Sequence, residues 1–303
     1  MAGLKELRLR ISSIASTQKI TSAMKMVAAA RLRKSQDMLQ KSQAYHTDFT
    51  TIIGRLVKEM KQDEKDGKVV YLKPQIMLPK AEENSVLLVV FSSDKGLCGN
   101  YNANVLKECV SRIRALKNEG KVVKVLSLGK KAGEGLKRRF DDIEVDVIDD
   151  FAAKGPDYDD TSDVVKRLMD GYGRDFDVCE VIYTFFNSAI DREIKCERFL
   201  PLDVEIDDND ERFDNKVSNA FYEYDGSKQG ILMDLVPMYA NNLMFQRLLN
   251  SQTSEHGARM TSMDNATRNA KDMINKLTLK YNRLRQSAIT TELIEIISGA
   301  EAL

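Results

Sequence analysis

The sequence contains few residues that break or cross-link a chain. Its 303 residues include five prolines, no tryptophan, two histidines and four cysteines. The cysteines form no C-x-x-C pair and lack metal-ligand spacing with either histidine, so we expect reduced structural thiols, no metal site and no cofactor. Lys and Arg number 46, as do Asp and Glu, and the resulting net charge of zero argues against a nucleic-acid-binding polycation.

Long hydrophobic runs are also missing. The longest candidate spans residues 86–91, whereas a membrane-spanning helix needs ~20 predominantly apolar residues. The N-terminal segment is amphipathic and lacks the apolar stretch of a secretory signal. We therefore expect a chain that does not cross a membrane and stays in the cytoplasm.

The distribution of proline predicts the shape of the molecule. All five prolines lie between Pro74 and Pro237, and a proline in a helix interior costs ~3 kcal/mol or more, so both ends can form long helices. Apolar residues at both ends step by three and four, which is the period of a helix that packs on another helix. The predicted seam residues are Leu4, Leu7, Ile11, Ile14, Met273, Leu277 and Leu284.

These two end helices should cover each other, because a helix with one apolar stripe is not stable alone in water. If the chain between them is one compact unit, both helices leave it on the same side and pair antiparallel. We place the N-terminal helix at 1–60, a connection at 61–84 and the C-terminal helix at 231–303. The prediction is a long antiparallel coiled coil.

The middle of the chain, residues 85–230, has the pattern of an α/β body. It contains short continuous apolar runs, which are typical of strands buried on both faces, and segments of helical spacing lie between them. This alternation predicts a mostly parallel sheet with flanking helices. The predicted strands are 86–91, 122–128 and 177–186, with 193–205 as a further candidate, and the predicted helices are 103–118 and 161–172.

Two glycine-containing segments are candidates for chemistry. Residues 92–102 follow a strand and precede a helix, where α/β proteins place a ligand or a nucleophile. Neither this segment nor residues 129–135 matches a phosphate-binding pattern, and we interpret both as structural turns. The acidic stretch 141–163 lacks calcium-loop spacing and is interpreted as a solvated face. An α/β enzyme that uses the turn at residues 93–102, with the helices serving only for oligomerisation, is an alternative. Cys98 in this turn could be a nucleophile only with a base, and the sequence pairs neither histidine with it.

The N-terminal helix is strongly basic. Residues 1–34 carry eight Lys and Arg against Glu6 alone. These charges flank the seam and do not form a separate basic region, so a polyanionic protein partner fits better than DNA. A structural coiled-coil adaptor of another assembly is a second alternative.

Four stretches of the sequence resemble the gamma subunit family of F-type ATP synthases. They are residues 17–30 (TQKITSAMKMVAAA), 93–99 (SDKGLCG), 259–270 (RMTSMDNATRNA) and 281–302 (YNRLRQSAITTELIEIISGAEA). The resemblance covers the whole chain in order. Segments 62–84 and 204–229 look longer than in many members of the family, and we assign them no role.

The resemblance implies a rotor with no bond chemistry of its own. The coiled coil would stand in the central cavity of a hexamer of alternating alpha and beta subunits. The body would rest, together with epsilon, on the c-subunit ring, with one copy of the chain in each complex. Ion flow would turn the ring and drive the beta catalytic sites through unlike conformations for ATP synthesis, or hydrolysis in reverse. The implied location is the cytoplasmic face of a bacterial inner membrane, as a peripheral protein.

The same resemblance suggests partner contacts. Arg285 and Gln286, with Thr290 one turn later, would meet a loop of a beta subunit. Met24 and Lys25 would lie where the lower end of a beta subunit approaches. An apolar tip would turn in its sleeve with little friction, and its predicted residues are Ile294, Ile296 and Ile297.

Overall fold

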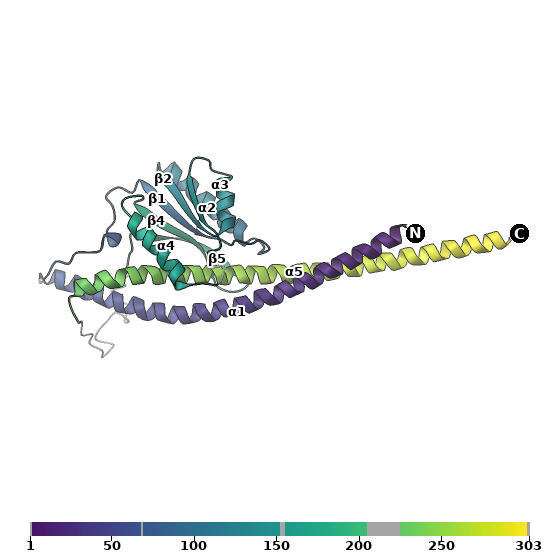
Figure 1. Ribbon diagram of the computed structural model, residues 1–303, viewed down its shortest axis with the longest axis horizontal. Helices are drawn as coiled ribbons and strands as arrows, with labels where there is room; N and C mark the ends of the chain where they lie inside the picture. Colours follow the sequence, from purple (N-terminus) through teal and green to yellow (C-terminus); the bar gives the residue numbers. More distant parts are fainter. Residues whose placement is uncertain (1, 68, 152–154, 205–224, 302–303) are drawn as a thin grey trace.

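The molecule consists of two very long helices and an α/β body on one side of them (Figure 1). The computed structural model describes residues 2–67, 69–151, 155–204 and 225–301. Helix α1 (Ala2–Lys65) has 64 residues and α5 (Lys228–Glu301) has 74, lengths of about 95 and 110 Å. They run antiparallel, and both chain ends lie at the end of the coil far from the body (Figure 1). The predicted fold class is confirmed.

One register holds the two helices together over their paired length. In four polar pairs across the interface, the two residue numbers add to 288 or 289. The pairs are Thr21–Thr267, Lys25–Asp264, Ser42–Gln246 and His46–Asn242. The same register places Gln286 opposite Ala2, so residues 287–301 of α5 extend past the start of α1, as Figure 1 shows.

Burial along the coil is uneven. Beside the body the two helices pack tightly, and Ile53 and Leu56 of α1 are fully buried with Leu232 and Met244 of α5. Ala28 and Ala270 are the outermost buried side chains; among the described residues, none in 3–27 or 271–298 is buried. The outer half of the coil therefore leaves much of its apolar surface uncovered.

Five of the predicted seam residues are half-buried, namely Leu4, Leu7, Ile11, Ile14 and Leu277. The other two differ from the prediction, because Met273 is 48% exposed and Leu284 is 42% exposed. The neighbouring Ile274 is half-buried and takes the seam position that the sequence pattern assigned to Met273. Leu284 lies opposite the first turn of α1, where little of the partner helix remains to cover it.

The body is built on a five-stranded sheet of order β3-β2-β1-β4-β5. The first four of these strands are parallel to one another, and β5 is antiparallel to β4. Residues of the central strand alternate between two cores: Leu88 and Val90 face one, and Val89 and Phe91 face the other. The strands are β1 (Ser85–Phe91), β2 (Val122–Leu128), β3 (Glu144–Ile148), β4 (Val178–Phe186) and β5 (Arg192–Leu200).

Helices cover both faces of this sheet. The first core contains side chains of α2 (Tyr101–Asn118) and α3 (Lys130–Lys137). The second core contains α4 (Tyr158–Gly171) and the body end of the coil. A short 3-10 helix, η1 (Gln75–Met77), lies in the connection from α1 to β1. The coil thus forms one layer of the body.

Two elements differ from the sequence interpretation. The acidic stretch that was interpreted only as a solvated face contains β3, whose Val145 is buried while Asp146 forms an ion pair with Arg167 at 2.5 Å. The second glycine-containing segment is the start of α3 and not a turn. Gly133 lets this helix approach β3 closely, because a Cβ atom there would lie 2.4 Å from Val147 Cγ2.

Candidate functional site: the coiled coil and its junction with the sheet

The end of β4 is hydrogen bonded to side chains of α5. The pairing of β4 with β1 ends at Ile182, so the backbone of Thr184 lies beyond the last residue of β4 that pairs with β1. The Thr184 N–H donates to Ser251 Oγ at 3.2 Å, and Ser254 Oγ donates to the Thr184 carbonyl at 3.2 Å. The Phe186 N–H donates to Asn250 Oδ1 at 3.3 Å. Polar side chains of α5 thus continue the hydrogen bonding that β1 no longer supplies.

This junction excludes water. Ser251, Ser254 and Thr184 are only 3%, 0% and 4% exposed. A buried backbone group that loses its partner costs ~1–3 kcal/mol, so each of these bonds holds the sheet on the helix. Two further hydrogen bonds join α5 to the body. Tyr101 Oη of α2 donates to the Ser251 carbonyl at 3.2 Å, and Thr261 Oγ1 donates to the Ala189 carbonyl at 3.3 Å.

Helix α1 is attached differently. Its extensive packing in the described part of the chain is with α5, whereas α5 also packs on β4 and α4. Ion pairs from Lys228 to Glu59 and Asp63, at 3.0 and 2.9 Å, join the two helices at the body end. The body is therefore fixed mainly to α5, and α1 is fixed to α5.

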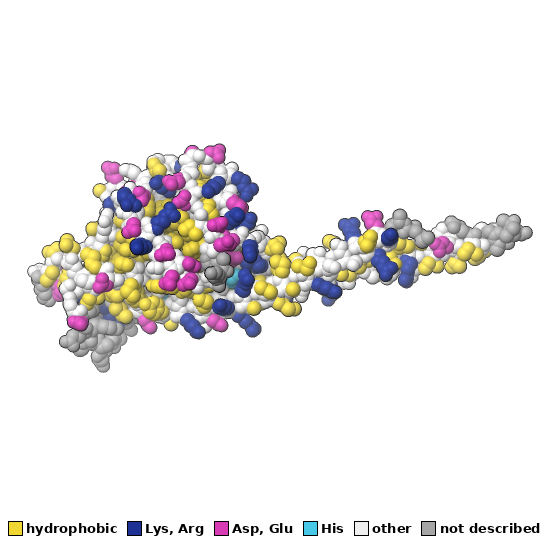
Figure 2. All heavy atoms as spheres, in the orientation of Figure 1, with side chains coloured by type: hydrophobic (Ala, Val, Ile, Leu, Met, Phe, Trp, Pro, Cys, Tyr) yellow, Lys and Arg dark blue, Asp and Glu magenta, His cyan; other side chains and the backbone are white. Residues whose placement is uncertain are grey.

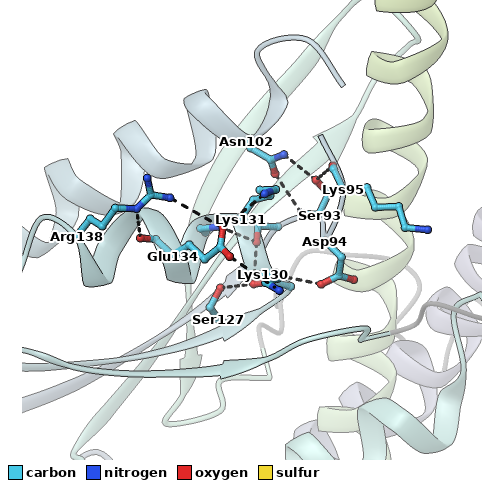
Figure 3. Close-up of polar contacts among 12 residues, drawn as sticks. Ser93, Asp94, Lys95, Asn102, Ser127, Lys130, Lys131, Glu134 and Arg138 are labelled. Atoms are coloured by element: carbon cyan, nitrogen blue, oxygen red, sulfur yellow. Dashed lines mark hydrogen bonds and ion pairs between the residues drawn. The ribbon is translucent and has the colours of Figure 1, made fainter. Parts of the chain in front are cut away.

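The turn that follows β1 holds its own polar groups (Figure 3). Ser93 Oγ donates to the Lys95 carbonyl at 2.7 Å, and Asn102 Nδ2 donates to Ser93 Oγ at 2.7 Å and to Cys98 Sγ at 3.2 Å. The Asp94 carboxylate accepts from the Lys130 N–H at 3.0 Å. These side chains stabilise the turn, and in the described part of the chain no group of three or more metal-ligating residues is placed to hold an ion.

Arg259 connects α5 to this turn. Its guanidinium donates to the carbonyls of Lys95 and Gly96 at 3.3 and 3.4 Å and pairs with Glu255 at 2.7 Å. Burial raises the pKa of Glu255, and burial lowers the pKa of the adjacent His256 to about 4. His256 is therefore neutral at physiological pH.

The structure places the predicted partner-contact residues in two separate groups. Arg285, Gln286 and Thr290 are exposed near the end of α5, where Thr290 Oγ1 donates to the Gln286 carbonyl at 2.9 Å. Met24 and Lys25 are half-buried, and Lys25 Nζ lies 2.5 Å from Asp264 of α5. Residues 264 and 285 are 21 positions apart, which corresponds to about 30 Å of helix, so the structure does not bring the two groups together.

The predicted apolar tip is exposed. Ile294, Ile296 and Ile297 are 58%, 68% and 57% exposed, on the part of α5 that extends past α1. Figure 2 shows the narrow end of the coil as a mixture of hydrophobic and charged side chains. An exposed row of large apolar side chains on a single helix indicates a surface that a partner covers.

The sequence interpretation missed the junction. Its signal is the polar run 250–254 (NSQTS), which interrupts the apolar pattern of a helix that must be buried there. Serine, threonine and asparagine are neutral or unfavourable inside helices, and when buried they need hydrogen-bond partners. Such a run predicts hydrogen bonding to a neighbouring element.

Comparison with known proteins identifies the family. A family model described as ATP synthase matches residues 3–303. The ATP synthase gamma chain of Rhodospirillum rubrum is 41% identical over 309 aligned residues that cover the whole of both chains. The chain belongs to the ATP synthase gamma chain family. The gamma chain of Pelagibacter ubique is 38% identical, again over the whole of both chains. As a gamma chain, the protein is a subunit of the ATP synthase complex and is not the catalytic one.

Solved structures agree with the gamma chain fold. A chain from the central stalk and c-ring of the Tetrahymena thermophila mitochondrial ATP synthase matches with a TM-score of 0.58 and 24% identity, covering 82% of this chain and 99% of that one. A chain of the Euglena gracilis mitochondrial ATP synthase (OSCP/F1/c-ring) matches with a TM-score of 0.55 and 17% identity, covering 90% and 95%. None of the helices in the described ranges of the gamma chain is apolar over a long enough stretch to span a membrane.

Proposed function

We propose that the chain is the rotor of an F-type ATP synthase. Its coil stands inside a hexamer of alpha and beta subunits, and its body rests with epsilon on the c-subunit ring, one copy in each complex. Rotation of the ring by ion flow turns the coil, which presents unlike faces to the beta catalytic sites and couples ion flow to ATP synthesis. The protein then lies as a peripheral protein at the cytoplasmic face of the bacterial inner membrane.

The observation that carries this proposal is the uncovered outer half of the coil. Beyond Ala28 and Ala270 no described side chain of either helix is buried, and the tip isoleucines are more than half exposed. A large exposed apolar surface favours aggregation of the free protein, so we infer that partner subunits surround this part of the coil. The apolar side chains near the end of α5 form few directional bonds with the surrounding subunits, so this end can rotate against them.

The junction supports a path for torque. A force applied to the body reaches α5 through buried hydrogen bonds at Ser251 and Ser254 and through the shared core. From α5 it reaches α1 through the seam and ion pairs such as Lys25–Asp264. The hydrogen bonds of the junction resist slippage because breaking them leaves buried groups unpaired.

The exposed polar residues supply the angle-dependent contacts. We propose that Arg285, Gln286 and Thr290 meet a loop of a beta subunit, and that Met24 and Lys25 meet the lower end of a beta subunit. Arg285 projects a guanidinium with no ion pair among the described residues, so an acidic loop would bind it without displacing an internal partner.

The test is reconstitution with alpha and beta subunits. ATPase activity is measured with and without the chain, and a probe on the exposed body is imaged during hydrolysis. We expect one copy in each hexamer, restored hydrolysis and stepwise rotation of the probe. Hydrolysis with a stationary probe would refute the rotor and favour a static adaptor.

The contact residues are tested separately in membranes that synthesise ATP. Arg285→Ala combined with Gln286→Ala should lower coupled synthesis about tenfold, the effect of one lost charge-assisted contact, while the complex still assembles. The control is Lys271→Ala combined with Asn275→Ala, which also removes one cation and one side-chain amide, from exposed positions closer to the body. Normal synthesis in the first variant would remove Arg285 and Gln286 from the contact.

A further inference from the structure

A large cavity lies where the coil meets the body. Its volume is about 610 Å³, and its walls come from α1, α5 and the turn after β1. Phe91 and Leu128 place it at the carboxyl ends of β1 and β2, the edge at which open α/β sheets bind ligands. Small-molecule sites have volumes of roughly 300–1,000 Å³, so the cavity is of ligand size.

Much of the cavity lining is apolar and remains in contact with solvent. Met24 and Val27 line it from α1, and Leu97 lines it from the turn. Val27 is 55% exposed and Leu97 is 62% exposed. Leu97 also has a φ of 64°, a left-handed conformation that costs a bulky residue ~1–2 kcal/mol. The turn thus holds an apolar side chain in a strained position without burying it.

The charges around the cavity favour an anion. Among the described residues its lining holds four basic side chains, those of Arg31, Lys34, Lys95 and Arg259, and three carboxylates, those of Asp94, Asp150 and Glu255. Glu255 pairs with Arg259, and Asp94 accepts from the backbone N–H of Lys130. The basic side chains of Arg31, Lys34 and Lys95 also line the cavity and form no ion pair with any described residue. Figure 3 shows Lys95 pointing away from the hydrogen bonds of the turn. The described lining therefore carries one more positive than negative charge.

We propose that this cavity binds a small amphipathic anion. The ligand class is an apolar ring or chain that carries one carboxylate, sulfonate or phosphate group. Its apolar part lies on Met24, Val27 and Leu97, and its charged group lies between Arg31, Lys34 and Lys95. A bound ligand would bridge α1 and the turn, two parts of the molecule that are otherwise joined through α5. Binding at this site requires only the folded chain.

The absence of tryptophan provides a direct test in the full-length chain. Met26→Trp places a single indole on α1 beside the cavity, at a residue that is 68% exposed and outside the lining. Leu279→Trp places the control indole on the outer coil, at a residue that is 72% exposed. The probe is anilinonaphthalene sulfonate, and phenylnaphthylamine is its neutral counterpart with the same apolar body. Energy transfer from the indole reports binding near each position.

We expect saturable transfer from the Met26→Trp indole to the sulfonate probe, and only weak, non-saturating transfer from the control. Arg31→Gln combined with Lys34→Gln should weaken sulfonate binding about tenfold, equivalent to one charge-assisted hydrogen bond, and leave the neutral probe unaffected. Lys276→Gln combined with Lys280→Gln, which removes two exposed cations from the outer coil, should change neither. Circular dichroism shows that each variant folds.

Three results would overturn the proposal. Equal transfer from both indoles would mean that the probe adsorbs on any exposed apolar surface. Equal binding of the sulfonate and neutral probes, or no effect of the Arg31 and Lys34 substitutions, would remove the anion site. Saturable transfer to a labelled acidic, apolar peptide but not to the sulfonate would show that the cavity takes a protein segment.

Discussion

Replacing the two serines of the junction, Ser251 and Ser254, should weaken the attachment of the sheet to α5 and lower the free energy of unfolding. Ser251→Ala leaves the buried Thr184 N–H without an acceptor, which costs ~1–3 kcal/mol. Ser254→Ala removes the donor to the Thr184 carbonyl, a bond with a net contribution of ~0.5–1.5 kcal/mol. The double variant should therefore lose about 1.5–4.5 kcal/mol of unfolding free energy.

Urea unfolding followed by circular dichroism measures this loss, and hydrogen exchange at the Thr184 amide locates it. Alanine has a higher helix propensity than serine, so the effect is compared with Ser287→Ala, an exposed position on the same helix. The control should stay within about 0.5 kcal/mol of the parent. A double variant as stable as the control, or an unchanged exchange rate at Thr184, would refute the role of these hydrogen bonds.

Two further predictions concern the coil and its histidine. Ile53→Ala should lower the free energy of unfolding in urea by about 2–5 kcal/mol because Ile53 is fully buried. Leu279→Ala, at a position that is 72% exposed, should lower it by less than about 0.5 kcal/mol. Similar losses in the two variants would contradict the uneven burial of the coil. His256 has a native pKa of about 4, below its ordinary 6.5, so between pH 7 and 5 the unfolded chain takes up a proton that the native state excludes. The parent should lose about 2 kcal/mol more than His256→Gln over this range, and parallel pH profiles would exclude the effect. The raised pKa of Glu255 acts with the opposite sign but is common to both proteins.

The large features of the fold could be predicted because each depends on a strong local signal. Four of the five prolines lie between the two long helices, and Pro237 lies in α5 near its start, so most of both ends is free of proline. An apolar stripe on such a long helix requires a partner. The apolar runs at 86–91 and 122–128 match β1 and β2 because strands buried on both faces need no polar alternation.

The remaining features depend on tertiary contacts that leave a weak trace in the sequence. Strand β3 is an edge strand whose carboxylates face solvent, and Val145 is its single buried residue. The segment therefore lacks the continuous apolar run by which the other strands were predicted. Helix α3 contains glycines because it lies close to its neighbours, Gly133 against Val147 of β3 and Gly135 against Leu106 of α2. At the seam, Met273 and Ile274 are both apolar, and only the packed register decides that Ile274 faces α1.

The antiparallel register also fixes when the coil can form during synthesis. Lys25 is separated from its partner Asp264 by 239 residues, so the outer part of α1 has no partner until nearly the whole chain has been made. Nearer the body, Lys228 pairs with Asp63 across 165 residues, and the packed body already holds these segments together. The coil should therefore close from the body toward the free ends, and the growing chain exposes the apolar stripe of α1 until its last segment arrives.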